Sequence, residues 1–432
     1  MRKPVTRRIT RPLAVAAAVV LGAGLLSSCG SDGKPVLNWY VNPDGVATLT
    51  ALAEKCSTAD YDIEIQLLPS GATDQRTQLA RRLAARDSST DLMSLDPVFV
   101  PEFANAGWLE EFTGEAATAV TEGILEGPLN TVMWEDGVFA APQWANTQVV
   151  WFRKSLAEAA GLTMDDTVTW DQVIEAAAEN DGTVGVQANK YEAYVVLINS
   201  LIQGAGGDIV TDTEQGKDAT VTIDSEAGRA AAAVIEKLAG SDAAQDDLSI
   251  SNEGTSLGQM FNDTAGEFMT NWTFVYKNYQ GLVESGDISQ EQFDDLGWAR
   301  YPRTLPDEPS RPPVGGIDIG VGAYSQHPDY ALAAAQCVTT SEAMEALARD
   351  EGLMPARGSV YDSPELKDYP DDLLELWQTS LDEGGARPKS AYYALISQAV
   401  QSRWHSPTSV DENTPEESAK FLQAVLDGKA LL

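Results

Sequence analysis

The sequence predicts an α/β protein made of two doubly wound lobes, and two observations carry this prediction. Apolar, strand-like segments alternate with amphipathic, helix-like segments from residue 36 onward, which is the order of a parallel sheet covered by helices. A mature chain of about 400 residues also exceeds what one hydrophobic core usually serves, so two lobes are expected. The hydrophobic fraction of 43% supports globular packing.

The first elements can be placed from their patterns. Short apolar runs bounded by turn residues predict strands at 36–40, 63–68 and 92–95. Apolar residues at helical spacing predict helices at 46–55, 74–85, 371–381 and 415–426, the second of them capped by Thr73. A further helix is expected to hold Phe103 and Trp108. Ligands of such sheets lie beyond the carboxyl ends of strands, where Asp44 and Asp96 fall.

The N-terminus has the order of a bacterial lipoprotein signal. Five basic residues precede an apolar stretch at 13–26, which is shorter than the roughly twenty residues of a membrane-spanning helix. The run Leu26-Ser27-Ser28-Cys29 that follows resembles a lipobox. We therefore expect a signal peptide at 1–28, a lipidated Cys29 with a linker at 29–35, and a protein anchored by lipid to the extracytoplasmic face of the cell membrane.

The charge of the chain limits its partners. Removing residues 1–28 takes away five basic groups and no acidic ones, so the formal charge falls from −36 to −41. Such a body repels nucleic acid and anionic lipid headgroups, so we expect no nucleic-acid partner and a membrane contact made through acyl chains. Because the carboxylates are scattered, the acidity is interpreted mainly as a solvated surface.

Two cysteines remain once Cys29 is assigned to lipid. An oxidising extracytoplasmic setting favours a disulfide between Cys56 and Cys337, and two buried thiols are the alternative. The disulfide would join segments 281 residues apart. It would require the chain after residue 310 to return to the lobe in which it began.

Several stretches resemble extracellular solute-binding proteins of the maltose-binding type. They lie at 137–142, 148–154, 101–112, 169–171 and 352–357. The resemblance implies a periplasmic-binding-protein-like fold of type II, with two lobes joined by a hinge and a ligand cleft between them. It implies a first lobe at 36–145 and 314–357 and a second at 146–313 and 358–432. Such a protein delivers its solute to the permease subunits of an ABC transporter.

Further segments resemble actinobacterial trehalose-binding lipoproteins. They include Gln75-Arg76, Leu95-Asp96, Asn146-Thr147-Gln148, Asn271-Trp272 and Ala386-Arg387-Pro388, and the positions of Cys56 and Cys337 agree. The chain departs from that pattern where 288–313 is shorter and where Gln143-Trp144-Ala145 replaces smaller residues. The resemblance implies that trehalose is the solute, while maltose, other α-glucosides and oligosaccharides remain alternatives.

The match, taken residue by residue, implies five ligand-binding residues: Asp96, Asn146, Glu253, Trp272 and Arg387. Carboxylate, amide and guanidinium groups suit the hydroxyls of a disaccharide, and an indole covers an apolar ring face. Each residue also has a structural alternative. Asp96 could cap a strand end, Asn146 could form a hinge turn and Glu253 could begin a helix. Trp272 could belong to the core, and Arg387 to a surface ion pair.

A second group of residues is left open between ligand contact and a structural role: Asp44, Gln75, Trp144, Gly316 and Tyr393. A sugar that touched both lobes would shift the balance between open and closed forms, and the closed form would be recognised by the transporter. We expect a monomer that needs no cofactor and no metal.

Catalysis is the alternative of another class. His327 and His405 are the only histidines, and no metal-binding or nucleophile motif is present, which argues against metal-dependent or triad hydrolysis. A glycosidase needs only two facing carboxylates about 5 to 10 Å apart, and Asp96 and Glu253 would be the candidates. Because sugar-binding proteins carry such carboxylates too, we expect a binding protein and not an enzyme.

Overall fold

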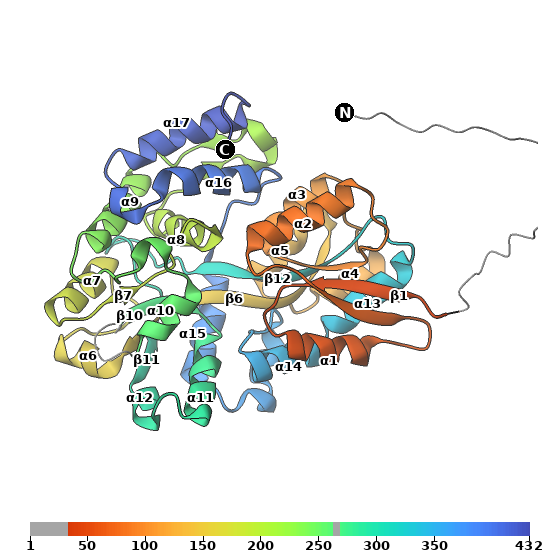
Figure 1. Cartoon of the computed structure of the whole chain (residues 1–432), viewed down its shortest axis with the longest axis horizontal. Helices are drawn as coiled ribbons and strands as arrows, with labels where there is room; N and C mark the ends of the chain where they lie inside the picture. Colours follow the sequence, from red (N-terminus) through yellow and green to blue (C-terminus); the bar gives the residue numbers. More distant parts are fainter. Residues whose placement is uncertain (1–32, 262–267) are drawn as a thin grey trace, which may run out of the picture. The chain divides into compact units, whose positions relative to one another are not determined.

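The computed structural model describes residues 33–261 and 268–432 (Figure 1). The signal peptide predicted at 1–28 and the lipidation site at Cys29 lie outside the described residues. Residues 35–432 form a single unit. Within the described ranges, no helix has the length and apolar character needed to cross a membrane.

One nine-stranded sheet organises the described chain, with strands in the order β2-β1-β3-β12-β6-β10-β7 (Figure 1). In addition, β11 pairs with β6 and β13 pairs with β12. The strands are β1 Val36–Val41, β2 Asp62–Leu67, β3 Leu92–Leu95, β6 Ala140–Arg153, β7 Val184–Gly185, β10 Phe268–Trp272, β11 Leu296–Ala299, β12 Pro313–Val321 and β13 Gly385–Ala386. Two small antiparallel pairs stand apart: β4 Met133–Trp134 with β5 Gly137–Val138, and β8 Val210–Thr211 with β9 Thr220–Val221.

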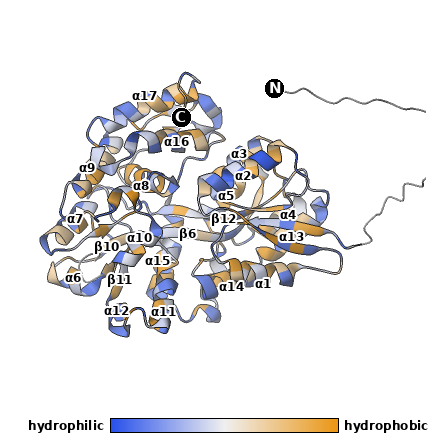
Figure 2. Cartoon of the chain, viewed as in Figure 1, coloured by the Kyte–Doolittle hydropathy of each residue, from blue (hydrophilic) through white to orange (hydrophobic). Residues whose placement is uncertain are grey.

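Amphipathic helices flank the sheet, and Figure 2 shows hydrophobic and hydrophilic residues side by side along them. They are α1 Val46–Cys56, α2 Ala72–Ala84, α3 Val100–Asn105, α4 Gly114–Thr121, α5 Glu126–Val132, α6 Lys154–Ala159, α7 Trp170–Glu179, α8 Glu192–Gln203 and α9 Glu226–Ala239, followed by α10 Glu253–Gln259, α11 Val275–Ser285, α12 Gln290–Asp294, α13 Pro328–Val338, α14 Ser341–Glu351, α15 Asp371–Asp382, α16 Tyr393–Trp404 and α17 Thr414–Leu426. Short 3₁₀ turns are η1 Pro97–Phe99, η2 Thr213–Asp218, η3 Leu248–Ile250, η4 Gly358–Asp362, η5 Pro364–Leu366 and η6 Pro407–Ser409.

The pairing of β6 and β12 explains how two lobes share one sheet. Strands β1, β2 and β3 are parallel, as predicted, but β12 runs antiparallel to both β3 and β6. Residues 140–147 of β6 pair with β12, while residues 148–152 of the same strand pair with β10. One long strand therefore belongs to both halves of the sheet. The two-lobed α/β class is confirmed, whereas the residue bounds of the lobes stay a prediction.

Each half of the sheet has its own hydrophobic core, which is what the length of the chain requires. One core gathers side chains such as Trp39, Ile319 and Leu347 around β1, β12 and α14. Another contains Trp170 and Trp404 and unites α7 through α9 with α16 and α17. The C-terminal helices predicted at 371–381 and 415–426 are present as α15 and α17.

The disulfide between Cys56 and Cys337 is confirmed. It joins the end of α1 to α13, with the two Cα atoms 5.9 Å apart. The chain after residue 310 thus returns through β12 and α13 to the half of the sheet in which it began. A crosslink that closes so long a loop is expected to stabilise the fold by about 2–4 kcal/mol.

Two local predictions were wrong. Thr73 does not cap α2, because that helix begins at Ala72 and its N-cap is Gly71, whose carbonyl accepts the first backbone bonds. Trp108 lies beyond α3, which ends at Asn105, because Gly107 adopts a left-handed conformation with φ of 66° and reverses the chain.

Gly316 marks the closest approach of the two long strands. Its φ is 139°, and a Cβ atom placed on it would lie 2.2 Å from the Trp144 carbonyl oxygen. The register between β12 and β6 shifts just after this point, between Ile317 and Asp318. A residue without a side chain is therefore required at this point of the pairing between β12 and β6.

Replacing this glycine should destabilise the fold. We expect Gly316→Ala to lower the free energy of unfolding by about 2 kcal/mol or more, because the methyl group meets backbone atoms that cannot move aside. Gly281→Ala is a matched control, since Gly281 is an exposed residue of α11 with open space around its Cβ position. Urea unfolding measures both variants, and equal midpoints for the two would contradict the expectation.

Candidate functional site

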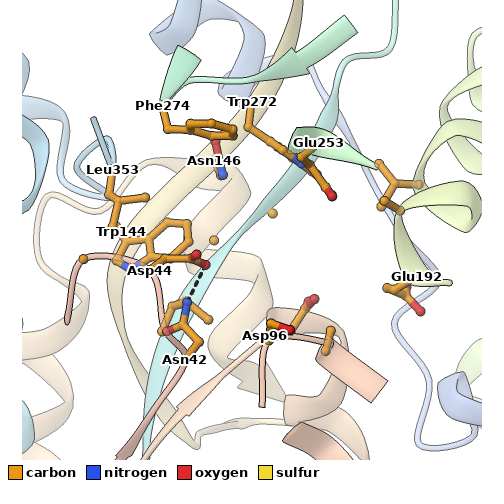
Figure 3. Close-up of a pocket in the computed structure, with 18 of the residues that line it drawn as sticks. Asn42, Asp44, Asp96, Trp144, Asn146, Glu192, Glu253, Trp272, Phe274 and Leu353 are labelled. Carbon is orange, nitrogen blue, oxygen red and sulfur yellow. Dashed lines mark hydrogen bonds between the residues drawn. The ribbon is translucent and has the colours of Figure 1, made fainter. Parts of the chain in front are cut away.

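A cavity of about 810 Å³ opens beyond the carboxyl ends of β1, β2 and β3 (Figure 3). This volume lies within the usual range for small-molecule sites. Nine of the ten residues predicted as first or second candidates line it: Asp44, Gln75, Asp96, Trp144, Asn146, Glu253, Trp272, Gly316 and Arg387. The patterns in the sequence therefore converge on one place in the fold.

Arg387 forms two ion pairs with other residues of the cavity lining. One terminal nitrogen donates to Asp96 Oδ1 at 2.9 Å, and the other donates to Glu192 Oε1 at 2.7 Å. The residue is only 6% exposed, so the alternative of a surface ion pair is wrong. The three residues come from the end of β3, the start of α8 and the segment after β13, which are far apart in the chain.

The electrostatics of this group follow from its burial. Burial alone would lower the pKa of Arg387, but the negative charges of Asp96 and Glu192 raise it above its ordinary value. Burial raises the pKa of Glu192 even though Arg387 opposes that change. Arg387 therefore stays a cation, and its charge is balanced by acidic neighbours inside the protein.

Tyr393 is the candidate that does not line the cavity. It is fully buried in α16, its hydroxyl donates to Glu192, and its ring lies 5.9 Å from the Arg387 guanidinium carbon. Ser397, one turn further along α16, donates to the second oxygen of Glu192 at 2.6 Å. Of the two roles left open for Tyr393, these contacts favour the structural one, since it supports Glu192 and Arg387 from behind.

Asp96 takes the strand-end role that was its structural alternative, and it also lines the cavity. Its carboxylate accepts a hydrogen bond from the backbone of Val98 at 3.3 Å and so caps the turn after β3. The same carboxylate oxygen accepts from Arg387. The strand-end cap thus orients Asp96 toward the cavity.

Asn146 and Asn271 fix the wall formed by β6 and β10. Asn146 Oδ1 accepts from the backbone and hydroxyl of Thr273, and Figure 3 shows the amide nitrogen of Asn146 pointing into the cavity. Asn271 donates to the carbonyl of Glu253 and accepts from the backbone of Trp272. The Trp272 ring lies against Gly315, where a Cβ atom would stand 3.4 Å from the indole. A larger residue at 315 would crowd the indole.

Glu253 is the first residue of α10, which was its structural alternative, and its side chain also lines the cavity. Asn252 caps the helix, so the Glu253 side chain is free to accept from the Tyr191 hydroxyl at 2.7 Å. Burial and the Glu253 charge raise the pKa of Tyr191. Tyr191 therefore remains a neutral hydrogen-bond donor.

The residues left open between ligand contact and a structural role make different contacts in the fold. Asp44 accepts from Asn42 at 2.7 Å; the surrounding walls raise the pKa of its carboxyl, although the side chain stays accessible to solvent. Trp144 packs with Leu353 in the core beside Asp44 (Figure 3). Gln75 donates to two carbonyls of the loop before α2 and so fixes that loop. Gly316 contributes backbone only.

Sequence reasoning missed several residues of this site, four of which bear on its chemistry. Glu192, Tyr191 and Phe274 line the cavity, and Asn271 positions two of its neighbours. Asn271 stood within a recognised motif but was not chosen. A buried arginine needs carboxylate partners, and this was the available signal for Glu192. The signal does not identify which carboxylate is the partner.

Comparisons with known proteins agree with this geometry. A cavity beyond the carboxyl ends of the strands is where open α/β sheets bind their ligands. Residues 42–345 match the family model for bacterial extracellular solute-binding proteins, and the chain belongs to that family.

Solved structures share the fold. Maltose-bound MalE3 of T. maritima is 22% identical with a TM-score of 0.78, over 91% of this chain and 100% of the other. The GacH receptor of Streptomyces glaucescens, solved unliganded and with acarbose, is 21% identical with a TM-score of 0.74, over 92% and 99%. The mannitol-binding protein of Pseudomonas aeruginosa is 24% identical over 138 residues, so the aligned part spans 32% of that relative.

Asp318 is a buried carboxyl group beside the site. It lies in β12, is 2% exposed and accepts from the Thr131 hydroxyl at 2.9 Å. Burial raises its pKa to about 8, and the charge of Asp96 acts in the same direction. The folded protein therefore keeps a proton on Asp318 at pH values where the unfolded chain has lost it.

This proton makes stability depend on pH. Between pH 4 and 8 the folded state binds more protons at this position, so the wild type should lose stability relative to Asp318→Asn as pH rises. Each unit of pKa difference corresponds to about 1.4 kcal/mol. Urea unfolding at several pH values measures the gap, with Asp307→Asn as an exposed control. A gap that does not change with pH would refute the assignment.

Proposed function

We propose that this protein captures a disaccharide, with trehalose favoured, and delivers it to the permease subunits of an ABC importer. The observation that carries the proposal is the lining of one cavity by an indole, an amide and several carboxylates, all oriented by neighbouring side chains.

We further propose that Cys29 is lipidated and holds the protein at the membrane. Detergent partitioning tests this anchor, because Cys29→Ala should move the protein to the aqueous phase.

Three polar groups of the cavity have hydrogen-bonding atoms that are not used within the protein. Among the described residues, one oxygen of Asp44, one oxygen of Glu253 and the Asn146 amide nitrogen have no bonding partner. Their other atoms are held in place, so little side-chain entropy is lost when a hydroxyl binds. Hydrogen bonds to charged groups are worth about 1.5–3 kcal/mol, and the face of Trp272 can cover an apolar ring face.

The ligands of related proteins support a saccharide. The solved relatives carry maltose or acarbose, and the curated relative is a mannitol-binding protein. The preference for trehalose rests on the resemblance to actinobacterial trehalose-binding lipoproteins. Maltose, other α-glucosides and oligosaccharides are the alternatives that the experiment must separate.

Closure of the lobes would couple binding to transport. With the predicted lobe bounds, Asp96 lies in the first lobe, whereas Glu253 and Trp272 lie in the second. A sugar that contacts all three stabilises the closed form relative to the open form. Differential affinity for the two forms is the only source of such a shift.

A panel of sugars tests the proposal. Thermal shift and calorimetry with trehalose, maltose, sucrose and maltotriose should give the largest effect for trehalose, and the sugar should be recovered intact. Release of glucose would support a hydrolase instead. If none of these sugars changes the melting temperature, the proposed function is wrong.

Variants of the cavity test the residues. Asp96→Asn and Trp272→Ala should each weaken trehalose binding at least tenfold, or about 1.4 kcal/mol, because each removes a contact from a desolvated site. Glu284→Gln changes an exposed residue of α11 and is the matched control. Titration calorimetry measures all three, and wild-type affinity in either cavity variant would remove that residue from the site.

A further inference from the structure

We propose that the cavity selects its sugar by charge, accepting uncharged and amino-substituted disaccharides and excluding sugar acids and sugar phosphates. This inference rests on the proposed function, because it names the class of sugar that the same cavity takes. It is carried by the way in which the charged groups of the lining are partnered.

Arg387 cannot serve as an anion-binding group. Both of its terminal nitrogens are committed, one to Asp96 at 2.9 Å and the other to Glu192 at 2.7 Å. With a carboxylate on each terminal nitrogen, the guanidinium offers no uncompensated positive charge to a ligand. A ligand carboxylate or phosphate would have to displace a protein carboxylate and leave it buried without its partner.

Two more carboxylates of the lining have only neutral partners. Asp44 accepts from the Asn42 amide and Glu253 from the Tyr191 hydroxyl. No lysine or arginine in 33–261 or 268–432 forms a salt bridge with either. Figure 3 shows both carboxylates projecting into the cavity. Each therefore presents uncompensated negative charge to a ligand.

The remaining charges do not reverse this balance. Six carboxylates and two basic side chains line the cavity, and Lys277 is the basic residue besides Arg387. Lys277 lies beside Gly352, whose neighbour Glu351 is another lining carboxylate. Asp350 is paired with Arg349, which leaves five lining carboxylates against the two basic side chains of the lining. The field inside the cavity is therefore negative, and low-dielectric walls strengthen such a field.

Independent features show that the same cavity is built to hold a polar ligand. Asn146 is more than nine-tenths buried, yet its amide nitrogen points into the cavity and has no partner among the described residues. Trp144 lies beside Asp44, and Trp272 lies close to Glu253 (Figure 3). An aromatic face next to a carboxylate is a favourable setting for an ammonium group. The surrounding walls raise the pKa of Asp44, and a ligand ammonium would lower it by stabilising the carboxylate.

A matched series of ligands tests the proposal by titration calorimetry. The series is trehalose, two derivatives with an amine at carbon 2 or carbon 6, and a derivative with a carboxylate at carbon 6. We expect at least one amine to bind as tightly as trehalose or more tightly, and the carboxylate to bind at least 30-fold more weakly, about 2 kcal/mol. Raising the salt concentration should weaken binding of the amine more than binding of trehalose.

Variants assign the effect to residues. Asp44→Asn and Glu253→Gln should each lower the ratio of amine affinity to trehalose affinity at least threefold, while Glu284→Gln should leave the ratio unchanged. Equal affinities for trehalose and the carboxylate, or amines that both bind more than tenfold more weakly than trehalose, would overturn charge selection and leave the proposed function intact. If no uncharged sugar binds, the proposed function itself fails.

Discussion

The burial of Arg387 between Asp96 and Glu192 is the interaction on which the site depends. A guanidinium removed from water is tolerated only when it is paired and hydrogen-bonded, and loss of one partner from such a pair costs about 3–5 kcal/mol. The three side chains come from β3, α8 and the segment after β13. Their meeting therefore fixes the relative positions of these elements around the cavity, and Tyr393 and Ser397 close the cluster from behind.

Hydrogen bonds from neighbouring side chains also hold other polar groups of the cavity in place. Three polar groups that face the ligand space are each held by a neighbouring side chain and keep part of their hydrogen-bonding capacity free. Thr273 holds Asn146, Tyr191 holds Glu253 and Asn42 holds Asp44. A cavity arranged in this way is preorganised for hydroxyl groups. The charged groups of the wall are either paired or negative. We therefore expect the wall to accept uncharged or cationic sugars and to exclude anionic ones.

Local patterns predicted much of this molecule because the relevant physics is local. Apolar runs gave β1, β2 and β3, and the expected compartment gave the disulfide. Long-range pairing was harder. The antiparallel return of β12 joins segments more than 150 residues apart, and no local signal records that partner. Glu192 was missed for the same reason, since a carboxylate at a helix start looks alike whether it meets solvent or Arg387. For Tyr393, the sequence left ligand contact and a structural role open, because the direction of a helix face depends on tertiary packing.

A crystal structure of the protein with bound trehalose would decide whether these side chains form the sugar site. We predict one sugar in the cavity, with a ring against Trp272 and hydroxyls bonded to Asn146 and Glu253. We also predict that Arg387 still bridges Asp96 and Glu192 in the complex. A sugar bound elsewhere, or an Arg387 that leaves both carboxylates to contact the ligand, would contradict these predictions.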